Sequence, residues 1–291
     1  MNLPRLSDDH GAEQPPKFDR GVSCLCWAHN ERPLIEGFIA RLDDLLRRTV
    51  EDYEIVVIDD GSTDGTREVL RALSQKNPRI VLGENEKNLN VGHCFRRAVK
   101  AARKEFLFWQ TVDWSYDLAN LRRYLELLRE FDVVAGSRWE KARFFPRLFS
   151  PSYLRARSDS LPKALVSIAN YLLVRLLFRL PLTDYQNTSI YPTALIRSFE
   201  YESDSSFANP ESLFRAYWRG MRIAEVPVGF IPRAAGRAKG TRLKAVRRSV
   251  ADILSLWWRW MVLRRFDFQK RGEVFRPGAE QLGRRLQRLK S

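Results

Sequence analysis

The sequence predicts an α/β fold in which a mainly parallel β-sheet is flanked by helices. Between residues 21 and 138, short apolar segments alternate with segments of helical spacing, an order that is typical of such sheets. Residues 53–58 are uncharged after Glu54 and rich in β-branched side chains, as expected of a strand buried on both faces. With 44% hydrophobic and 12% aromatic residues, the chain has a globular rather than a disordered composition.

The expected elements follow one another closely up to residue 138. Strands are predicted at residues 22–27, 53–58, 80–82, 106–110 and 132–135. Helices are predicted at residues 33–48, 64–76, 91–103 and 118–130. Because crossovers between parallel strands are right-handed, the loops that follow the strands should share one edge of the sheet.

Beyond residue 138 this alternation stops. Residues 139–162 are rich in Arg, Phe, Pro and Ser and have no clear period. The later elements that the sequence predicts are helices at 163–180, 210–219 and 244–265 and a strand at 223–231. We therefore divide the chain into a polar, mobile leader (1–20), an α/β domain (21–240) and a basic, amphipathic helical segment (241–291).

Positive charge is concentrated in two segments. The 50 basic and 35 acidic side chains leave a net charge of +15, which implies an anionic partner. Residues 242–291 carry a net +10 and residues 139–180 a net +6, so the rest of the chain is close to neutral. A nucleic-acid enzyme more often carries basic residues across its body, and here the strands are apolar and their loops acidic. Nucleic acid is therefore not an expected partner.

The predicted helix at 244–265 carries an apolar stripe beside basic residues. The stripe consists of Val246, Val250, Ile253, Leu254, Trp257 and Met261. The first 20 residues lack the apolar run of a secretory signal, and no stretch approaches the roughly 20 apolar residues of a membrane span. We expect a cytoplasmic protein that rests on the inner face of an anionic membrane through this helix. The alternative is that the stripe packs on the α/β domain.

Three predicted strands end in polar clusters, at residues 28–31, 59–66 and 110–113. In a parallel sheet these clusters meet in one crevice. Paired carboxylates such as Asp59 and Asp60 suit ribose hydroxyls or nucleobase N–H groups, and a further carboxylate opposite them can hold a divalent cation on a diphosphate. The alternative is a strand exit followed by a helix cap at Ser62 or Asp64.

Residues 56–66, with the sequence VVIDDGSTDGT, resemble the signature of family 2 glycosyltransferases with the GT-A fold. The resemblance extends, in the same order, through residues 90–92, the Asp113 region and residues 136–138. Residues 225–228 and 232–240 resemble the dolichyl- or polyprenyl-phosphate sugar transferase branch of that family. The match covers roughly residues 21–260, and it implies that the α/β domain is catalytic.

The resemblance implies transfer of a sugar from a nucleotide-sugar, with inversion at the anomeric carbon. By position, Asp59 would contact the base, Asp60 the ribose region, and Asp113 a Mg²⁺ or Mn²⁺ ion. The implied catalytic residues are Asp113, Glu211 and Arg138, with Glu211 facing the crevice and Arg138 near phosphates. The implied nucleotide-sugar-binding residues are Ala28, Asn30, Glu31, Asp59, Asp60, Thr111, Val112, Arg233 and Lys239.

The chain also departs from the family pattern. Thr111 stands in place of the first metal aspartate, and residues 184–188 replace a usual Gly-Phe-Arg segment. Two acceptors stay open. A lipid phosphate, which we favour, is already an anion and needs no general base, whereas a hydroxyl of a glycan or glycolipid would need Asp113, Asp117 or Glu211 to take its proton. A non-catalytic protein that binds a sugar nucleotide is a third possibility.

Overall fold

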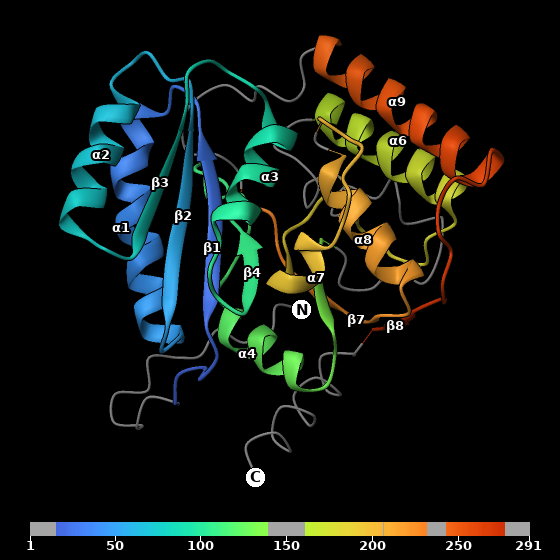
Figure 1. The fold of residues 1–291 in the computed structure, drawn as a ribbon, viewed down its shortest axis with the longest axis horizontal. Coiled ribbons are helices and arrows are strands. Elements are labelled where there is room, and N and C mark those ends of the chain that lie inside the picture. Colours follow the sequence, from blue (N-terminus) through green and yellow to red (C-terminus); the bar gives the residue numbers. More distant parts are fainter. Residues whose placement is uncertain (1–15, 139–160, 206, 232–242, 277–291) are drawn as a thin grey trace.

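The computed structural model describes residues 16–138, 161–205, 207–231 and 243–276. Within these residues, an eight-stranded sheet lies between two layers of helices (Figure 1). The strand order is β3-β2-β1-β4-β6-β5-β7-β8. Strand β6 is antiparallel to β4 and β5, and the other neighbouring strands are parallel. The predicted mainly parallel α/β fold is confirmed.

The strands begin and end close to the predicted positions. Their bounds are β1 Val22–Ala28, β2 Tyr53–Asp60, β3 Ile80–Asn85, β4 Phe106–Trp109, β5 Val133–Ser137, β6 Ser189–Pro192, β7 Arg222–Pro227 and β8 Glu273–Phe275. The sequence did not predict β6 or β8, which have four and three residues. Strand β7 ends at Pro227, so the predicted strand at 223–231 is shorter than expected.

The helices also follow the prediction, with three changes, the first of which is a five-residue helix, Thr193–Arg197, that the sequence did not predict. Their bounds are α1 Arg32–Thr49, α2 Thr66–Lys76, α3 Val91–Ala101, α4 Leu121–Glu126, α6 Leu161–Phe178, α7 Thr193–Arg197, α8 Ala208–Trp218 and α9 Leu243–Trp257. The predicted helix at 118–130 begins only at Leu121 and ends in a 3₁₀ turn, Leu127–Arg129. The long helix at 244–265 ends in a π-helical turn, Trp258–Val262.

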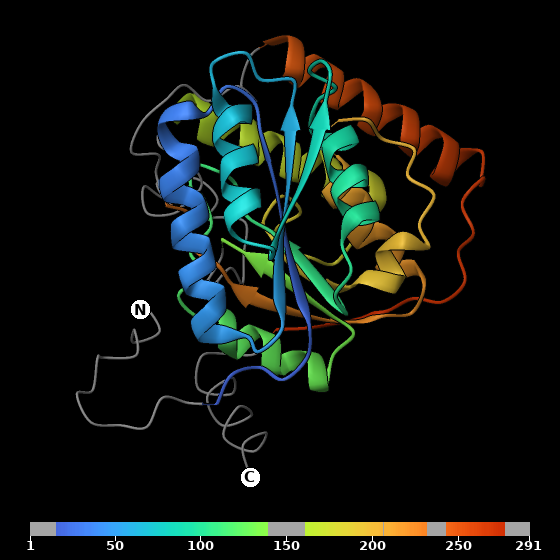
Figure 2. The ribbon, with the colours of Figure 1, turned by 60° about the vertical axis from the view of Figure 1, so that its left-hand side comes forward.

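Two cores, one on each face of the sheet, are built from alternate residues of the strands. In β2, Ile55 and Val57 face the core under α1, α2 and α4, while Val56 and Ile58 face the core under α3, α6, α7, α8 and α9 (Figures 1 and 2). Successive side chains of a strand point to opposite faces, so an uninterrupted apolar strand serves both cores. This explains why β2 is buried along its whole length.

The C-terminal helix belongs to the second core. Ile253 and Trp260 are fully buried, and the Trp260 ring stacks on Phe214 with 4.9 Å between centroids. Strand β8 extends the same sheet beside β7. The core therefore continues across the predicted boundary at residue 240. The predicted leader also ends before residue 20, because Phe18 is fully buried and pairs with Val50.

Candidate active site

The strand order brings the predicted polar clusters to one edge of the sheet. Ala28 at the end of β1 lies beside Asp59 of β2, and Ser137 at the end of β5 lies beside Pro227 of β7. Because β6 runs antiparallel, its first residue, Ser189, lies at the same edge and brings residues 183–188 there. This carboxyl edge is where ligands bind in open α/β sheets.

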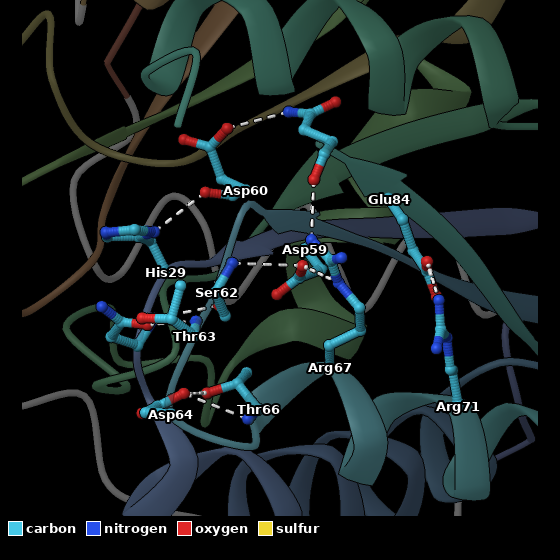
Figure 3. A network of polar contacts seen from close by, with 12 residues as sticks. His29, Asp59, Asp60, Ser62, Thr63, Asp64, Thr66, Arg67, Arg71 and Glu84 are labelled. Carbon is cyan, nitrogen blue, oxygen red and sulfur yellow. Dashed lines mark hydrogen bonds and ion pairs between the residues drawn. The ribbon is translucent and has the colours of Figure 1, made fainter. Parts of the chain in front are cut away.

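The two carboxylate oxygens of Asp59 differ in their hydrogen bonds (Figure 3). Its side chain is fully buried, and Oδ2 accepts hydrogen bonds from Arg67 Nε at 2.9 Å and from the Ser62 amide at 3.3 Å. The other oxygen, Oδ1, is buried and has no hydrogen-bond partner among the described residues. A buried acceptor without a donor costs free energy. An N–H group of a ligand would satisfy it, as the predicted base contact requires.

Asp60, predicted to lie near the ribose, accepts three hydrogen bonds from the protein. One oxygen accepts hydrogen bonds from Asn85 Nδ2 and the Leu89 amide, both at 2.8 Å, and the other from the Asn90 amide at 3.1 Å. The carboxylate is 5% exposed. We therefore assign Asp60 to holding the loop that precedes α3, because three donors already occupy this buried group.

Asn30 and Glu31 lock the loop after β1 to the loop after β2. The Asn30 amide donates to Ser62 Oγ at 3.0 Å, and Asn30 Oδ1 accepts from the Thr63 amide at 2.9 Å. The Glu31 amide donates to Thr66 Oγ1 at 3.0 Å. Asn30 has a φ of 53°, in the left-handed region that Asn tolerates better than most residues. The backbone amides of both residues and the side chain of Asn30 thus hold the two loops together.

The N-cap of α2 is Gly65 and not Ser62 or Asp64, and Asp64 binds the turn just before it. Asp64 Oδ1 accepts from the Thr66 amide at 3.0 Å, and Oδ2 accepts from the Arg32 amide at 3.1 Å (Figure 3). Burial alone would raise the pKa of Asp64, but these hydrogen bonds together with the one from the Thr66 hydroxyl hold it below its ordinary value.

Ala28 and Val112 have buried side chains, so only their backbones can face a ligand.

Thr111 and Asp113 lie in a tight loop after β4. Thr111 Oγ1 accepts from the Ser115 amide at 3.1 Å, and Asp113 Oδ1 accepts from Ser115 Oγ at 2.7 Å. The Ile231 amide donates to Ser115 O at 3.0 Å, so the chain enters residues 232–242 from beside this loop. The predicted phosphate ligands Arg233 and Lys239 lie outside the described residues.

The loop can hold a divalent cation only with help from a ligand. In the described part of the chain, no three His, Cys, Asp or Glu side chains form a metal-binding group. Asp113 is a half-buried carboxylate at the edge, whereas Thr111 offers a hydroxyl. Mg²⁺ is often bound through one or two carboxylates together with substrate phosphates and water. The residues therefore fit a cation that Asp113 shares with a diphosphate.

Glu211, predicted to face the crevice, is buried in the first turn of α8. Its carboxylate is fully buried and accepts the amides of Glu202 at 2.9 Å and Ser203 at 3.0 Å, and it pairs with Arg215 at 2.8 Å. Burial raises the pKa of Glu211, although these donors oppose the shift. Because its oxygens already hold the 202–203 backbone, Glu211 is a structural residue here.

Arg138 reaches the edge from the end of β5 in a buried ion pair. Its Nε and Nη2 donate to the two carboxylate oxygens of Asp184 at 2.6 and 2.8 Å. The sequence analysis did not identify Asp184 as the partner of Arg138 or Arg67 as the partner of Asp59. No local sequence pattern predicts the pair of Arg138 and Asp184, because 46 residues separate them.

The fold and this edge define the class of the protein as GT-A-like. Its structure is similar to glucosyl-3-phosphoglycerate synthase from Mycobacterium tuberculosis, solved with Mn²⁺, uridine diphosphate and phosphoglyceric acid. The TM-score is 0.55 at 18% identity, over 82% of this chain and 78% of that one. Residues 23–171 match the family described as glycosyl transferase family 2. The chain belongs to this family.

Curated relatives lie in the same family. Glycosyltransferase AglD of Haloferax volcanii is 29% identical over 248 residues, which cover 83% of this chain and 38% of AglD. Dolichol-phosphate mannosyltransferase of Pyrococcus furiosus is 29% identical over 150 residues, 49% of this chain and 42% of the relative. The chain thus spans about two fifths of the length of these two. A dolichyl-phosphate hexose transferase of Haloferax volcanii is 27% identical, over 73% of this chain and 84% of its own length.

Proposed function

We propose that this glycosyltransferase moves a sugar from a nucleoside-diphosphate sugar to the phosphate of a polyprenyl-type lipid, with inversion at the anomeric carbon. The single observation that carries the donor assignment is Oδ1 of buried Asp59, which has no hydrogen-bond partner among the described residues and suits a nucleobase N–H. The names of two relatives, a dolichol-phosphate mannosyltransferase and a dolichyl-phosphate hexose transferase, support the acceptor.

The proposed reaction is a single displacement. An oxygen of the acceptor phosphate forms a bond to the anomeric carbon, and the bond from that carbon to the diphosphate breaks on the opposite side. The electron pair leaves with the nucleoside diphosphate. A cation bound with Asp113 would stabilise this charge as a Lewis acid, and Arg138, Arg233 and Lys239 are the proposed basic residues near the phosphates.

The structural role of Glu211 favours the phosphate acceptor. A hydroxyl acceptor would need a carboxylate to remove its proton, and Glu211 is buried with its oxygens occupied. Asp113 and Asp117 would remain for that task, and Asp113 is already assigned to the cation. A phosphate acceptor needs no base because it is anionic at neutral pH. The same site can therefore serve a lipid phosphate without a further residue.

We also propose that the enzyme works at the inner face of an anionic membrane. Helices α6 and α9 lie side by side (Figure 1), and both expose apolar side chains. Leu176 of α6 is 74% exposed and Trp258, just after α9, is 52% exposed. Arg247, Arg264 and Arg265 are exposed on or beside α9. Tryptophan favours the headgroup level, and basic residues favour anionic lipid.

The predicted apolar stripe is thus divided between the two alternatives that the sequence left open. Ile253 is fully buried in the second core, whereas Val250 and Leu254 are 36% and 44% exposed. Val246 has no described side chain. In the described part of the chain, no helix has the length and apolar character of a membrane span.

A donor panel tests the proposed function. The full chain is titrated by calorimetry with uridine, guanosine and cytidine diphosphate sugars, each with and without Mg²⁺ or Mn²⁺. We expect one nucleotide to bind, and we expect the cation to strengthen binding of the diphosphate. Absence of binding to every donor under all conditions would contradict the proposal. Binding without any transfer to polyprenyl phosphate would instead favour a non-catalytic sugar-nucleotide-binding protein.

A further inference from the structure

We propose that Asp184 is a positioning residue for sugar transfer, which orients the guanidinium of Arg138 at the carboxyl edge. The inference rests on the proposed function, in which Arg138 lies near the phosphates. Asp184 belongs to residues 184–188, the segment in which this chain departs from its family pattern. The structure gives this departure a physical meaning, because the segment supplies the partner of Arg138.

The contact between the two residues is bidentate and largely buried. Arg138 Nε and Nη2 donate to Asp184 Oδ2 and Oδ1 at 2.6 and 2.8 Å, and the Arg138 amide donates to Oδ2 at 3.2 Å. The side chains are 10% and 1% exposed. A bidentate pair of this kind fixes the plane of a guanidinium as well as its position.

The backbone at Asp184 is itself hydrogen-bonded to Glu225. Glu225 of β7 is 5% exposed, and its Oε1 accepts from the Thr183 amide at 2.6 Å, Thr183 Oγ1 at 2.7 Å and the Asp184 amide at 3.3 Å. Arg276 Nε pairs with Glu225 Oε2 at 2.6 Å. Such an arrangement keeps the Asp184 carboxylate at a fixed place when charge changes nearby, which is the property that a positioning residue needs.

The expected consequence for catalysis follows from charge development. The departing diphosphate gains negative charge in the transition state, so a donor that is fixed in advance stabilises the transition state more than the bound substrate. Loss of Asp184 should therefore lower kcat more than it raises KM for the donor. The loss should also disappear when Arg138 is absent, because Asp184 acts only through Arg138.

A double-mutant cycle with the full chain tests this inference. The variants are Asp184→Asn, Arg138→Gln and the double variant, with Asp184→Glu as the conservative replacement. We expect Asp184→Asn to lower kcat about 10-fold or more, a typical loss for an orienting partner. Arg138→Gln should lower kcat by about 10². The double variant should be no slower than Arg138→Gln alone, and Asp184→Glu should recover part of the activity.

The matched control is Glu54→Gln. Glu54 is also 1% exposed and pairs with Arg103 at 2.9 Å, but it lies near the start of β2, toward the opposite edge of the sheet. It should lose thermal stability like Asp184→Asn while keeping kcat within about twofold, because an ion pair far from the proposed site affects stability and not the reaction. Circular dichroism and thermal melting of every variant show which of them fold.

Three results would overturn the inference. Additive effects of Asp184→Asn and Arg138→Gln on kcat would mean that Asp184 does not act through Arg138. A lower melting temperature of Asp184→Asn with unchanged kcat would reduce Asp184 to a structural residue. If the wild-type protein binds none of the nucleoside diphosphates UDP, GDP and CDP, the proposed function fails first and this inference fails with it.

Discussion

The carboxylate of Asp59 serves two purposes with its two oxygens. Oδ2 is bound by Arg67 and by the Ser62 amide, so this half of the group belongs to the fold. Oδ1 has no described partner and is buried. The two neighbouring aspartates thus differ, because every oxygen of Asp60 already accepts a hydrogen bond from the protein. Adjacent residues of the same type can therefore have different roles.

We predict that Asp59→Ala weakens binding of the free nucleoside diphosphate. A buried base donor that loses its acceptor costs about 1–3 kcal/mol, or roughly a 5- to 150-fold loss of affinity. Isothermal calorimetry on the folded variant measures this affinity for the nucleoside diphosphate. The control is Glu84→Ala, which removes a more exposed ion pair with Arg71 one strand away (Figure 3) and should leave the affinity nearly unchanged. Equal affinities of wild type and Asp59→Ala would refute the base contact.

We predict that Asp113→Asn lowers turnover by about 10² or more without unfolding the protein, the size of a typical electrostatic contribution to catalysis. The half-buried carboxylate is the proposed protein ligand of the cation, and its ligand role depends on its charge. Thr111→Asp restores the second carboxylate and should be tolerated, with a stronger dependence on the cation. Steady-state rates across a range of Mg²⁺ and Mn²⁺ concentrations provide the test, and unchanged turnover in Asp113→Asn would move the cation elsewhere.

At the scale of elements, the turn between β2 and α2 should respond to acid. The pKa of Asp64 is lower in the folded state than its ordinary value near 4, because Thr66 and Arg32 donate hydrogen bonds to its charged form. The stabilisation is present above that ordinary value and is lost as the pH falls through the lower, folded value. Melting temperatures of wild type and Asp64→Asn should therefore differ most above about pH 4 and converge below it. A constant difference would contradict this.

Two adjacent residues of helix α9 differ in burial and should respond differently to substitution. Ile253 is fully buried, so Ile253→Ala should cost about 2–5 kcal/mol of unfolding free energy. Leu254 is 44% exposed, so Leu254→Ser should leave stability nearly intact and weaken binding to anionic vesicles. Denaturant unfolding and vesicle flotation measure the two effects, and flotation of the wild type should fall with added salt. Unaltered flotation of Leu254→Ser together with Trp258→Ser would exclude α9 as the membrane contact.

At the scale of the whole molecule, the sequence predicts the parallel half of the sheet and its polar edge well. Residues 55–58 of strand β2 are all apolar because both faces of the strand are buried, and that property is visible in the sequence. Strands β6 and β8 are too short to show a period. The burial of Glu211 and the pairing of Arg138 with Asp184 depend on contacts that no local pattern encodes.

Transfer of labelled sugar to lipid tests the central claim most directly. The full chain is incubated with its best-bound nucleotide-sugar and anionic vesicles that contain polyprenyl phosphate or, in a parallel sample, polyprenol. The account predicts labelled lipid phosphate in the first sample, none in the second, and a loss of labelling in Asp113→Asn. Labelling of polyprenol, or no labelled lipid in either sample while the donor still binds, would contradict a phosphate acceptor.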